Sequence, residues 1–269
     1  MSLHTADAIV LRHYPYRETS ALVSCLTDRF GKIRGMIKGL WGQRATEKYR
    51  SPMEPLTLNR IVFYDNRNSG LHLISHCDLT GPYLELTREL ETMQTAACCI
   101  ELVDALVEPD EPQPAIFSLL KATLSRLGRQ GDQLVMARVQ FMLRLLKLVG
   151  FQPQLDHCVA CTGDLSDRRA FWSVRQGGVM CECCLHQDPS AGAMAPELLE
   201  ALSQCAEAEH PPELHPGLAA IVQRRVEEFL HWRVERPLKT LPGGRTRRAP
   251  TVRPWAPKAR PLEEVEAVA

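Results

Sequence analysis

Two pairs of cysteines in the second half of the chain have the spacing of a metal site. Cys158 and Cys161 form one C-x-x-C pair, Cys181 and Cys184 form a second, and residues 162–180 separate them. This spacing is typical of a four-thiolate zinc site, in which each pair directs both sulfurs at one ion. Four sulfurs leave no open coordination position, so we expect one structural Zn²⁺ rather than a catalytic one.

The segment between the pairs predicts how they meet. Two short apolar runs flank Gly177-Gly178 in "AFWSVRQGGVM", which is a good hairpin turn and would return the second pair beside the first. Two ligand alternatives stay open. Cys183 and His186 form a C-x-x-H that could replace the second pair, and His157 lies beside the first pair. Buried thiols without a metal are the alternative for the whole cluster.

The net charge of zero conceals a separation of charge along the chain. Residues 78–115 carry nine acidic side chains and one basic one, whereas residues 233–260 carry nine basic side chains and one acidic one. Residues 29–50 carry seven basic side chains against Glu47 alone. Blocks of one sign favour polyanion binding at particular surfaces. The expected nucleic-acid-binding side chains are Arg29, Lys32, Arg34, Lys38, Arg44, Lys48 and Arg50.

Short apolar runs separated by turn residues fill the N-terminal part of the chain. Five such runs in about 75 residues are typical of a small barrel or sandwich. We expect these strands at residues 6–14, 19–27, 32–39, 55–64 and 71–75.

The third of these strands carries the strongest functional signal. Alternation places its isoleucines on one face and Lys32, Arg34 and Lys38 on the other. A solvated outer face would look the same, but the following loop adds further cations together with Trp41 and Tyr49. Interleaved cations and aromatic rings suit single-stranded nucleic acid, because cations contact phosphates while rings stack on bases.

From residue 83 onwards the apolar period becomes helical. The third of the helices is apolar on nearly every side, which is typical of a central core helix. Cys98 and Cys99 lie within the first and are expected to be small buried apolar groups rather than ligands. We expect the helices at residues 83–107, 115–128, 132–150, 195–206 and 216–236.

Together these patterns predict an α+β fold. We expect residues 1–80 to form a small five-stranded barrel or sandwich that binds nucleic acid, and an all-α domain to follow over 81–240. The zinc-binding hairpin is an insertion in that domain at 155–187. Residues 241–269 form a basic tail rich in proline and arginine that we expect to be disordered.

Several classes of protein do not fit the sequence. The N-terminal residues show no basic stretch followed by an apolar run, so we expect no signal peptide and a cytoplasmic protein. The most apolar helical stretch, 134–149, is interrupted by Arg138, Arg144 and Lys147, which argues against a membrane span. No nucleophile elbow, phosphate loop or paired-carboxylate signature is present, so we expect a protein that is not an enzyme.

Taken in order, these features resemble the RecO family of bacterial DNA repair and recombination mediators. The N-terminal strand "IVL" at Ile9, the turn at Tyr16-Arg17-Glu18, and the basic strand ending at Lys38-Gly39 match the family pattern. The paired cysteines follow, and "RPLKT" from Arg236 is close to a C-terminal element of the family. The resemblance covers about residues 5–240 and depends on the order and spacing of all the motifs together.

The resemblance implies a function. Family members have an OB-fold followed by a zinc-bearing helical domain, bind single- and double-stranded DNA, and anneal complementary strands. They load RecA onto DNA coated with SSB, with RecR as a partner, which implies a nucleoid-associated protein in the cytoplasm. For the acidic C-terminal tail of SSB, we expect a docking surface in the helical domain at Lys121, Arg126, Arg129 and Arg138.

Two other functions fit the same residues. A zinc-thiolate redox-regulated chaperone would also gather cysteines, provided that its thiolates have low pKa values and can be reached by solvent. An RNA-binding OB-fold protein would present the same cationic face.

Overall fold

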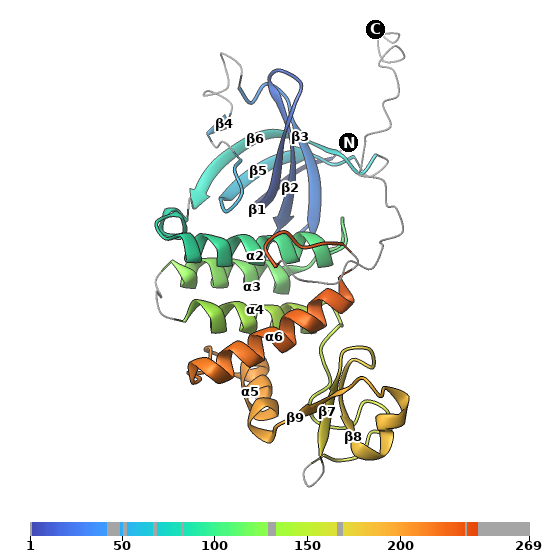
Figure 1. The fold of residues 1–269 in the computed structure, drawn as a ribbon. Coiled ribbons are helices and arrows are strands. Elements are labelled where there is room, and N and C mark those ends of the chain that lie inside the picture. The colour runs from blue at the N-terminus through green and yellow to red at the C-terminus, as the bar shows by residue number, and fades with distance from the viewer. Residues whose placement is uncertain are drawn as a thin grey trace.

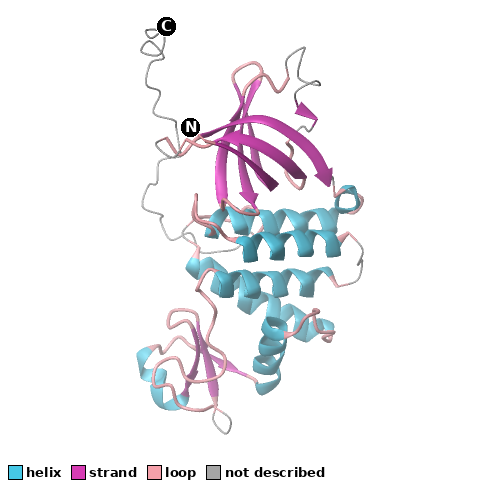
Figure 2. Ribbon diagram, turned by 180° about the vertical axis from the view of Figure 1, so that it is seen from behind, coloured by secondary structure: helices cyan, strands magenta, loops and turns pink. Residues whose placement is uncertain are grey.

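The computed structural model describes residues 2–41, 49–50, 53–66, 69–81, 83–128, 133–165, 169–234 and 236–241. The molecule is built in successive layers, with a β-barrel at one end, stacked helices in the middle, and a small cysteine-bearing sheet at the other end (Figure 1). Figure 2 shows the same three parts from behind. Residues 242–269 of the expected tail lie outside the described residues.

Four antiparallel pairings and one parallel pairing close the N-terminal strands into a barrel. The neighbours follow the order β3-β2-β1-β5-β6, and the parallel pairing of β3 with β6 completes the circle. The predicted five-stranded OB-like barrel is therefore confirmed. Its strands are β1 (Leu3–Tyr16), β2 (Ser20–Thr27), β3 (Lys32–Ile37), β5 (Leu58–Tyr64) and β6 (His72–Gly81), and the two-residue β4 (Tyr49–Arg50) lies beside β6.

The alternation expected for the third strand is present in β3. Ile33 and Ile37 are fully buried in the barrel, with Phe63 and Ile74 from β5 and β6. Arg34, between the two isoleucines, is exposed. The barrel thus has an apolar interior and keeps part of its outer surface open to solvent.

The helical layer follows the predicted order, with one difference at its start. The expected single helix over 83–107 is a short 3₁₀ turn, η1 (Leu84–Thr87), followed by α2 (Leu90–Leu106). The break occurs because Tyr83 has a left-handed backbone, with φ of 44°, and Glu89 is extended. The remaining helices are α3 (Pro114–Leu127), α4 (Leu134–Leu148), α5 (Pro196–Glu207) and α6 (Pro216–Arg233).

Helix α4 is the centre of the helical layer, as its apolar sequence predicts. It packs against α2, α3, α5 and α6, and Phe141, Leu145 and Leu146 are fully buried. The same apolar cluster takes in Ile9 and Leu26 from the barrel. The barrel interior forms a separate apolar cluster, so barrel and helices meet at an apolar interface and do not share one core. None of the helices in the described parts of the chain combines the length and apolar character needed to cross a membrane.

The small sheet at the far end contains the predicted hairpin and one further strand. β7 (Ala170–Ser173) and β8 (Gly178–Cys181) pair antiparallel, as the glycine turn predicts. β9 (Gly192–Met194) pairs with the other edge of β7, so the sheet extends beyond the insertion expected at 155–187. Cys181 ends β8, and the 3₁₀ turn η2 (Glu182–Gln187) that follows carries Cys184.

Asp104 on α2 joins the barrel to the helices. Its carboxylate lies 2.5 Å from Arg12 Nε on β1 and 2.8 Å from the Arg236 guanidinium, and it accepts a hydrogen bond from Ser24 on β2. Burial raises the pKa of Asp104, but the hydrogen bond from Arg236 and the charges of Arg12 and Lys32 outweigh burial and place the pKa below its usual value. A nearly buried carboxylate is stable here only because cations surround it.

Lys32 corrects the expectation of a fully exposed cationic face on β3. It points outward as alternation predicts, but it is only 7% exposed because α2 and the following loop cover it. Its Nζ donates to the Asp104 carbonyl oxygen at 2.8 Å, and its own carbonyl accepts from Asp110 N–H. Burial lowers the pKa of Lys32. Lys32 therefore contacts the helical layer in this structure.

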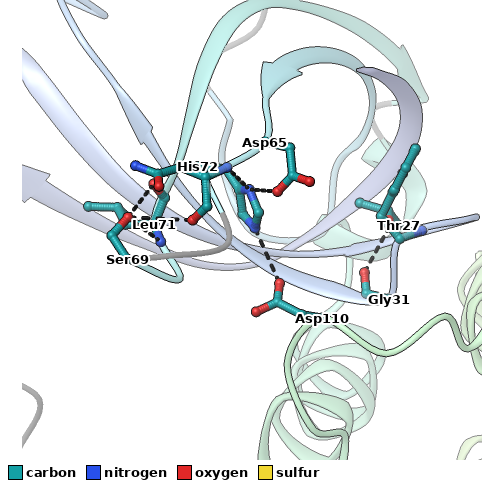
Figure 3. Close-up of polar contacts among 9 residues, drawn as sticks. Thr27, Gly31, Asp65, Ser69, Leu71, His72 and Asp110 are labelled. Carbon is teal, nitrogen blue, oxygen red and sulfur yellow. Dashed lines mark hydrogen bonds and ion pairs between the residues drawn. The ribbon is translucent and has the colours of Figure 1, made fainter. Parts of the chain in front are cut away.

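His72 makes a second contact between barrel and helices (Figure 3). This buried side chain on β6 places Nε2 3.2 Å from a carboxylate oxygen of Asp110, in the loop before α3. On the other side of the ring, Nδ1 lies 3.2 Å from the Asn66 backbone N–H, which donates to it, and 3.3 Å from Asp65. The two carboxylates and one amide fix the orientation of the ring between the layers.

A short C-terminal strap, residues 236–241, closes the interface from outside. Glu101 on α2 accepts hydrogen bonds from the backbone N–H groups of Lys239 and Thr240 and from the Thr240 hydroxyl, at 2.6–2.9 Å. Leu241, expected to begin the free tail, is instead only 4% exposed, and its carbonyl lies 2.9 Å from His231 Nε2. The element "RPLKT" is therefore an anchor on α2.

We predict that Asp104→Asn lowers the free energy of unfolding by roughly 3 kcal/mol, because it leaves partly buried cations without their counter-charge. The folded-state pKa of Asp104 is depressed, so its contribution is present above the unfolded pKa and is lost as the pH falls through the folded value. The difference between wild type and variant, measured by urea unfolding, should therefore shrink below about pH 4.

The matched control is Glu91→Gln, which removes an exposed carboxylate from the first turn of the same helix. It should cost less than about 1 kcal/mol. Equal losses in the two variants at neutral pH would show that Asp104 is an ordinary surface charge.

Candidate metal centre and nucleic-acid interface

The structure brings the two predicted cysteine pairs together. The sulfur atoms of Cys158, Cys161, Cys181 and Cys184 all lie within 4.8 Å of one another. Cys161 Sγ and Cys181 Sγ, one from each pair, are 3.8 Å apart. Three of the four residues are buried and Cys161 is exposed. These four sulfurs could hold one metal ion.

Backbone hydrogen bonds shape the first pair into a tight turn. Cys158 N–H donates to the Gly163 carbonyl, and Thr162 N–H donates back to the Cys158 carbonyl at 2.8 Å. Val159 N–H donates to the Val179 carbonyl on β8, which fixes this turn against the hairpin. The position of the first pair therefore depends on the hairpin that carries the second.

Gly178 is required by a close approach of two backbones. Gln154 N–H donates to the Gly177 carbonyl and Val179 N–H donates to the Gln154 carbonyl, so residue 154 lies directly against the turn. A Cβ on Gly178 would lie 2.2 Å from the Gln154 carbonyl oxygen. Gly177 has φ of 98°, a conformation that favours glycine. The two glycines thus make the turn and allow the backbone of Gln154 to approach it closely.

The second pair consists of Cys181 and Cys184 among the described residues. Cys183 is exposed, and His186 Nδ1 lies 3.0 Å from the Cys183 carbonyl oxygen. Neither residue belongs to the sulfur cluster. His157 Nε2 lies 2.7 Å from the Gln154 side-chain amide and is likewise outside the cluster. The four-sulfur set is the one that the geometry supports.

The protonation behaviour of the cluster fits a cation site. Burial raises the pKa of Cys158, but backbone N–H groups of Cys181 and Cys161 donate to its sulfur, and the net pKa falls to about 6. Hydrogen bonds with the Cys181 and Cys161 thiols raise the pKa of Cys184 to about 12. Four neighbouring sulfurs cannot all carry negative charge without a cation, and a soft divalent ion could supply that charge.

Two residues that sequence reasoning missed hold the hairpin in place. Ser173 Oγ at the end of β7 donates to the Asp188 carboxylate at 2.5 Å, and the same Asp188 accepts from Ser190 N–H and Oγ. The hydrogen bond from Ser173 lowers the pKa of Asp188. The sequence signal was an Asp-x-Ser turn directly after the second pair, of the kind in which Asp accepts from the backbone two residues later.

The expected nucleic-acid residues divide into three groups. Arg34 and Lys38 are exposed at β3, and Arg29 is exposed beside Phe30, where it donates to the Thr5 carbonyl. Lys32 is buried against α2, as described above. Arg44, Lys48 and the side chain of Arg50 lie outside the described residues.

The two aromatic side chains expected in the loop after β3 have different environments. Trp41 is 47% exposed and stacks on the His13 ring, with centroids 5.5 Å apart and planes 9° apart. Tyr49 is only 7% exposed, and its hydroxyl donates to the Lys38 carbonyl. Trp41 can therefore offer a ring face to a ligand, whereas Tyr49 shapes the loop.

The cations expected to bind a protein partner do not form one open surface. Lys121 is exposed on α3. Arg126 donates to Gln140 on α4, and Arg138 lies 3.4 Å from Glu227 on α6, with only 17% of its side chain exposed. Both of these arginines pack between helices. Arg129 lies outside the described residues.

We predict that Cys181→Ser loses most of the metal that the wild-type protein carries after purification, because the cluster then has three sulfurs. The matched control is Cys183→Ser, two residues away and exposed, which should retain the wild-type metal content. Elemental analysis of both proteins measures the ratio of metal to chain. Equal metal loss in the two variants would exclude the proposed ligand set.

Two family models of known proteins together match nearly all of the residues that the structure describes. Residues 1–83 match the family model described as "Recombination protein O N terminal", and residues 88–242 match "Recombination protein O C terminal". The boundary between the two matches falls between the barrel and α2.

Full-length relatives give the same result. The chain is 31% identical over 193 residues to the DNA repair protein RecO of Geobacter metallireducens, covering 72% of this chain and 77% of the relative. It is 29% identical over 231 residues to the DNA repair protein RecO of Salinibacter ruber, covering 85% and 86%. It is 33% identical over 187 residues to the same protein of Moorella thermoacetica, covering 69% and 68%.

Proposed function

Because the chain belongs to the RecO family of DNA repair proteins, we propose that it is a recombination mediator that binds DNA through the outer face of its barrel. It anneals complementary single strands and, together with RecR, helps to load RecA onto single-stranded DNA coated with SSB. In this role it binds and positions DNA and is not an enzyme. Its place of action is the nucleoid.

The observation that carries this proposal is the arrangement of cations at the open part of the barrel. Arg34 and Lys38 are exposed on the outer side of β3, and Trp41 follows directly with an exposed ring. Cations of this kind bind phosphates of any sequence, and an exposed ring offers a stacking surface to an unpaired base. The same surface would serve double-stranded DNA through its phosphates alone.

The metal ion that fits the cysteine cluster best is Zn²⁺. Four thiolates in two C-x-x-C pairs suit a tetrahedral zinc ion, which supplies the positive charge that the sulfurs need. A site closed by four protein ligands is structural, so the ion would stabilise the fold of the small sheet and take no part in DNA chemistry.

For a docking surface that binds the acidic tail of SSB, the helical layer offers fewer exposed cations than the four expected from the sequence. Of the three cations that the structure describes, Lys121 is exposed, whereas Arg126 and Arg138 contact neighbouring helices. We propose Lys121 as part of that surface.

The direct test of the mediator role is annealing of two complementary oligonucleotides that have each been coated with SSB, with and without this protein. The protein should accelerate annealing. A second reaction, with RecR and RecA added to the SSB-coated strand, tests whether this protein and RecR together promote RecA loading. Comparing affinity for single-stranded DNA and RNA of equal length separates the proposal from an RNA-binding function. Tighter binding to RNA would favour the latter.

We predict that Arg34→Ala combined with Lys38→Ala weakens binding to single-stranded DNA of any sequence. The slope of log K against log salt concentration should fall by about 1.4 units, because each phosphate contact on a single strand contributes about 0.7. Fluorescence anisotropy over a salt series measures the slope. Thermal stability should change little, because exposed cations contribute little to folding.

The control is Lys121→Ala combined with Lys147→Ala, which removes two exposed cations from the helical layer. This variant should keep the wild-type slope. If it is the helical variant that loses salt dependence, the DNA surface lies on the helices and not on the barrel.

A further inference from the structure

The outer face of the barrel carries a row of apolar side chains that the strand register places side by side. Tyr14 on β1 pairs with Leu22 on β2, Leu22 pairs with Met36 on β3, and Met36 pairs with Leu73 on β6. Tyr14 is 49% exposed, and the other three are partly exposed. These four residues, called the apolar row below, cross four neighbouring strands on the solvent side.

Cations lie on both sides of the apolar row. A second set of outward positions lies two residues from the apolar row along each strand, on the side nearer α2. There the register places Arg12 on β1 and Arg34 on β3 on either side of Ser24. In the other direction lie Lys38, just beyond β3, and Arg17, just beyond β1, both exposed. Successive outward positions on a strand are about 6.7 Å apart. The apolar row is thus flanked at close range by positive charge.

Arg12 links the row to the contact between barrel and helices. The Arg12 Nε pairs with Asp104, while Arg12 Nη1 donates to the Tyr14 hydroxyl at 3.0 Å. The Asp104 carboxylate is shared with Arg236, and the charge of Glu101 also acts on Arg12. Arg12 is therefore a paired cation that holds the tyrosine ring in position, and the exposed cations beside the row include Lys38 and Arg17.

We infer that the apolar row binds the unpaired bases of a single strand while the flanking cations bind its phosphates. This inference rests on the proposed DNA-binding function and adds the basis of its selectivity. A single strand exposes both its apolar base faces and its phosphates, whereas a duplex hides the base faces in its stack. The apolar row consequently favours single-stranded over double-stranded DNA.

The charge pattern distinguishes this part of the barrel from the next. Continuing around the barrel, Leu73 pairs with Tyr64 on β5, which is 37% exposed. The residue after Tyr64 is Asp65, and Arg60, four residues back along β5, is paired with Asp7 at 3.1 Å. Tyr14 has Arg12 and Arg17 two and three residues away in the chain, whereas Tyr64 adjoins an acidic residue. Tyr64 therefore supplies a matched control of the same residue type.

The experiment compares three fluorescent probes of equal length: oligothymidine, a base-free deoxyribose-phosphate oligomer, and duplex DNA. Wild-type protein should bind oligothymidine more tightly than the other two. Tyr14→Ala should weaken oligothymidine binding about 10-fold, because removing one stacking residue typically costs that order of affinity. Its affinity for the base-free oligomer and its salt slope should stay within about twofold of wild type.

Tyr14→Phe keeps the ring and loses only the hydrogen bond to Arg12, so it should retain most of the preference for bases. Tyr64→Ala should leave all three affinities unchanged. Thermal melting of each variant confirms that it is folded.

The outcomes separate the inference from the proposed function. If wild-type protein binds none of the probes, the proposed DNA-binding function itself fails. If binding occurs but Tyr14→Ala loses affinity equally for all three probes, or Tyr64→Ala loses as much for oligothymidine, the apolar row does not recognise bases and the inference is overturned.

Discussion

The pairing of Asp104 governs how the two main parts of the molecule fit together. A carboxylate that is only 9% exposed is costly unless cations and hydrogen-bond donors surround it, and here they come from separate parts of the chain. Arg12 comes from the first strand and Arg236 from beyond the last helix. Because one oxygen of Asp104 faces both guanidiniums, small shifts of barrel against helices would break the pairing. Apolar contacts between barrel and helices are non-directional, so it is the pairing of Asp104 that defines their relative position more closely.

This arrangement also divides the outer face of the barrel by function. The part nearest α2 uses its polar groups, Lys32 among them, to contact the helices. Farther along β3, Arg34 and Lys38 remain exposed. The cations that stabilise the interface and those proposed to bind DNA therefore belong to one continuous surface. At the far end, the sulfur cluster and the Asp188 contacts organise a separate small sheet, so the two candidate sites depend on different local interactions.

Sequence reasoning succeeded where a pattern depends on local geometry. Alternation in β3 correctly separated the buried Ile33 from the exposed Arg34, and cysteine spacing with a glycine turn predicted the sulfur cluster. It was wrong about the exposure of Lys32 because alternation gives the direction of a side chain and not what packs over it. The break before α2 was missed for a similar reason, since it depends on the backbone of Tyr83 and not on apolar periodicity. Strand β9 was missed because three residues give too short a pattern to recognise.

The strap that binds Glu101 and Asp104 has a consequence for the order in which the protein is made. Arg236 and Thr240 are 132 and 139 residues from their partners on α2, so both carboxylates emerge from the ribosome long before the groups that complete their pairing. During synthesis, the barrel and α2 can associate through Arg12 and Lys32, but the outer side of α2 stays open until the strap arrives. Closure of the interface therefore waits until residues 236–240 have been made, and a chain cut short before Arg236 would present an incompletely paired α2 to the cell's proteases.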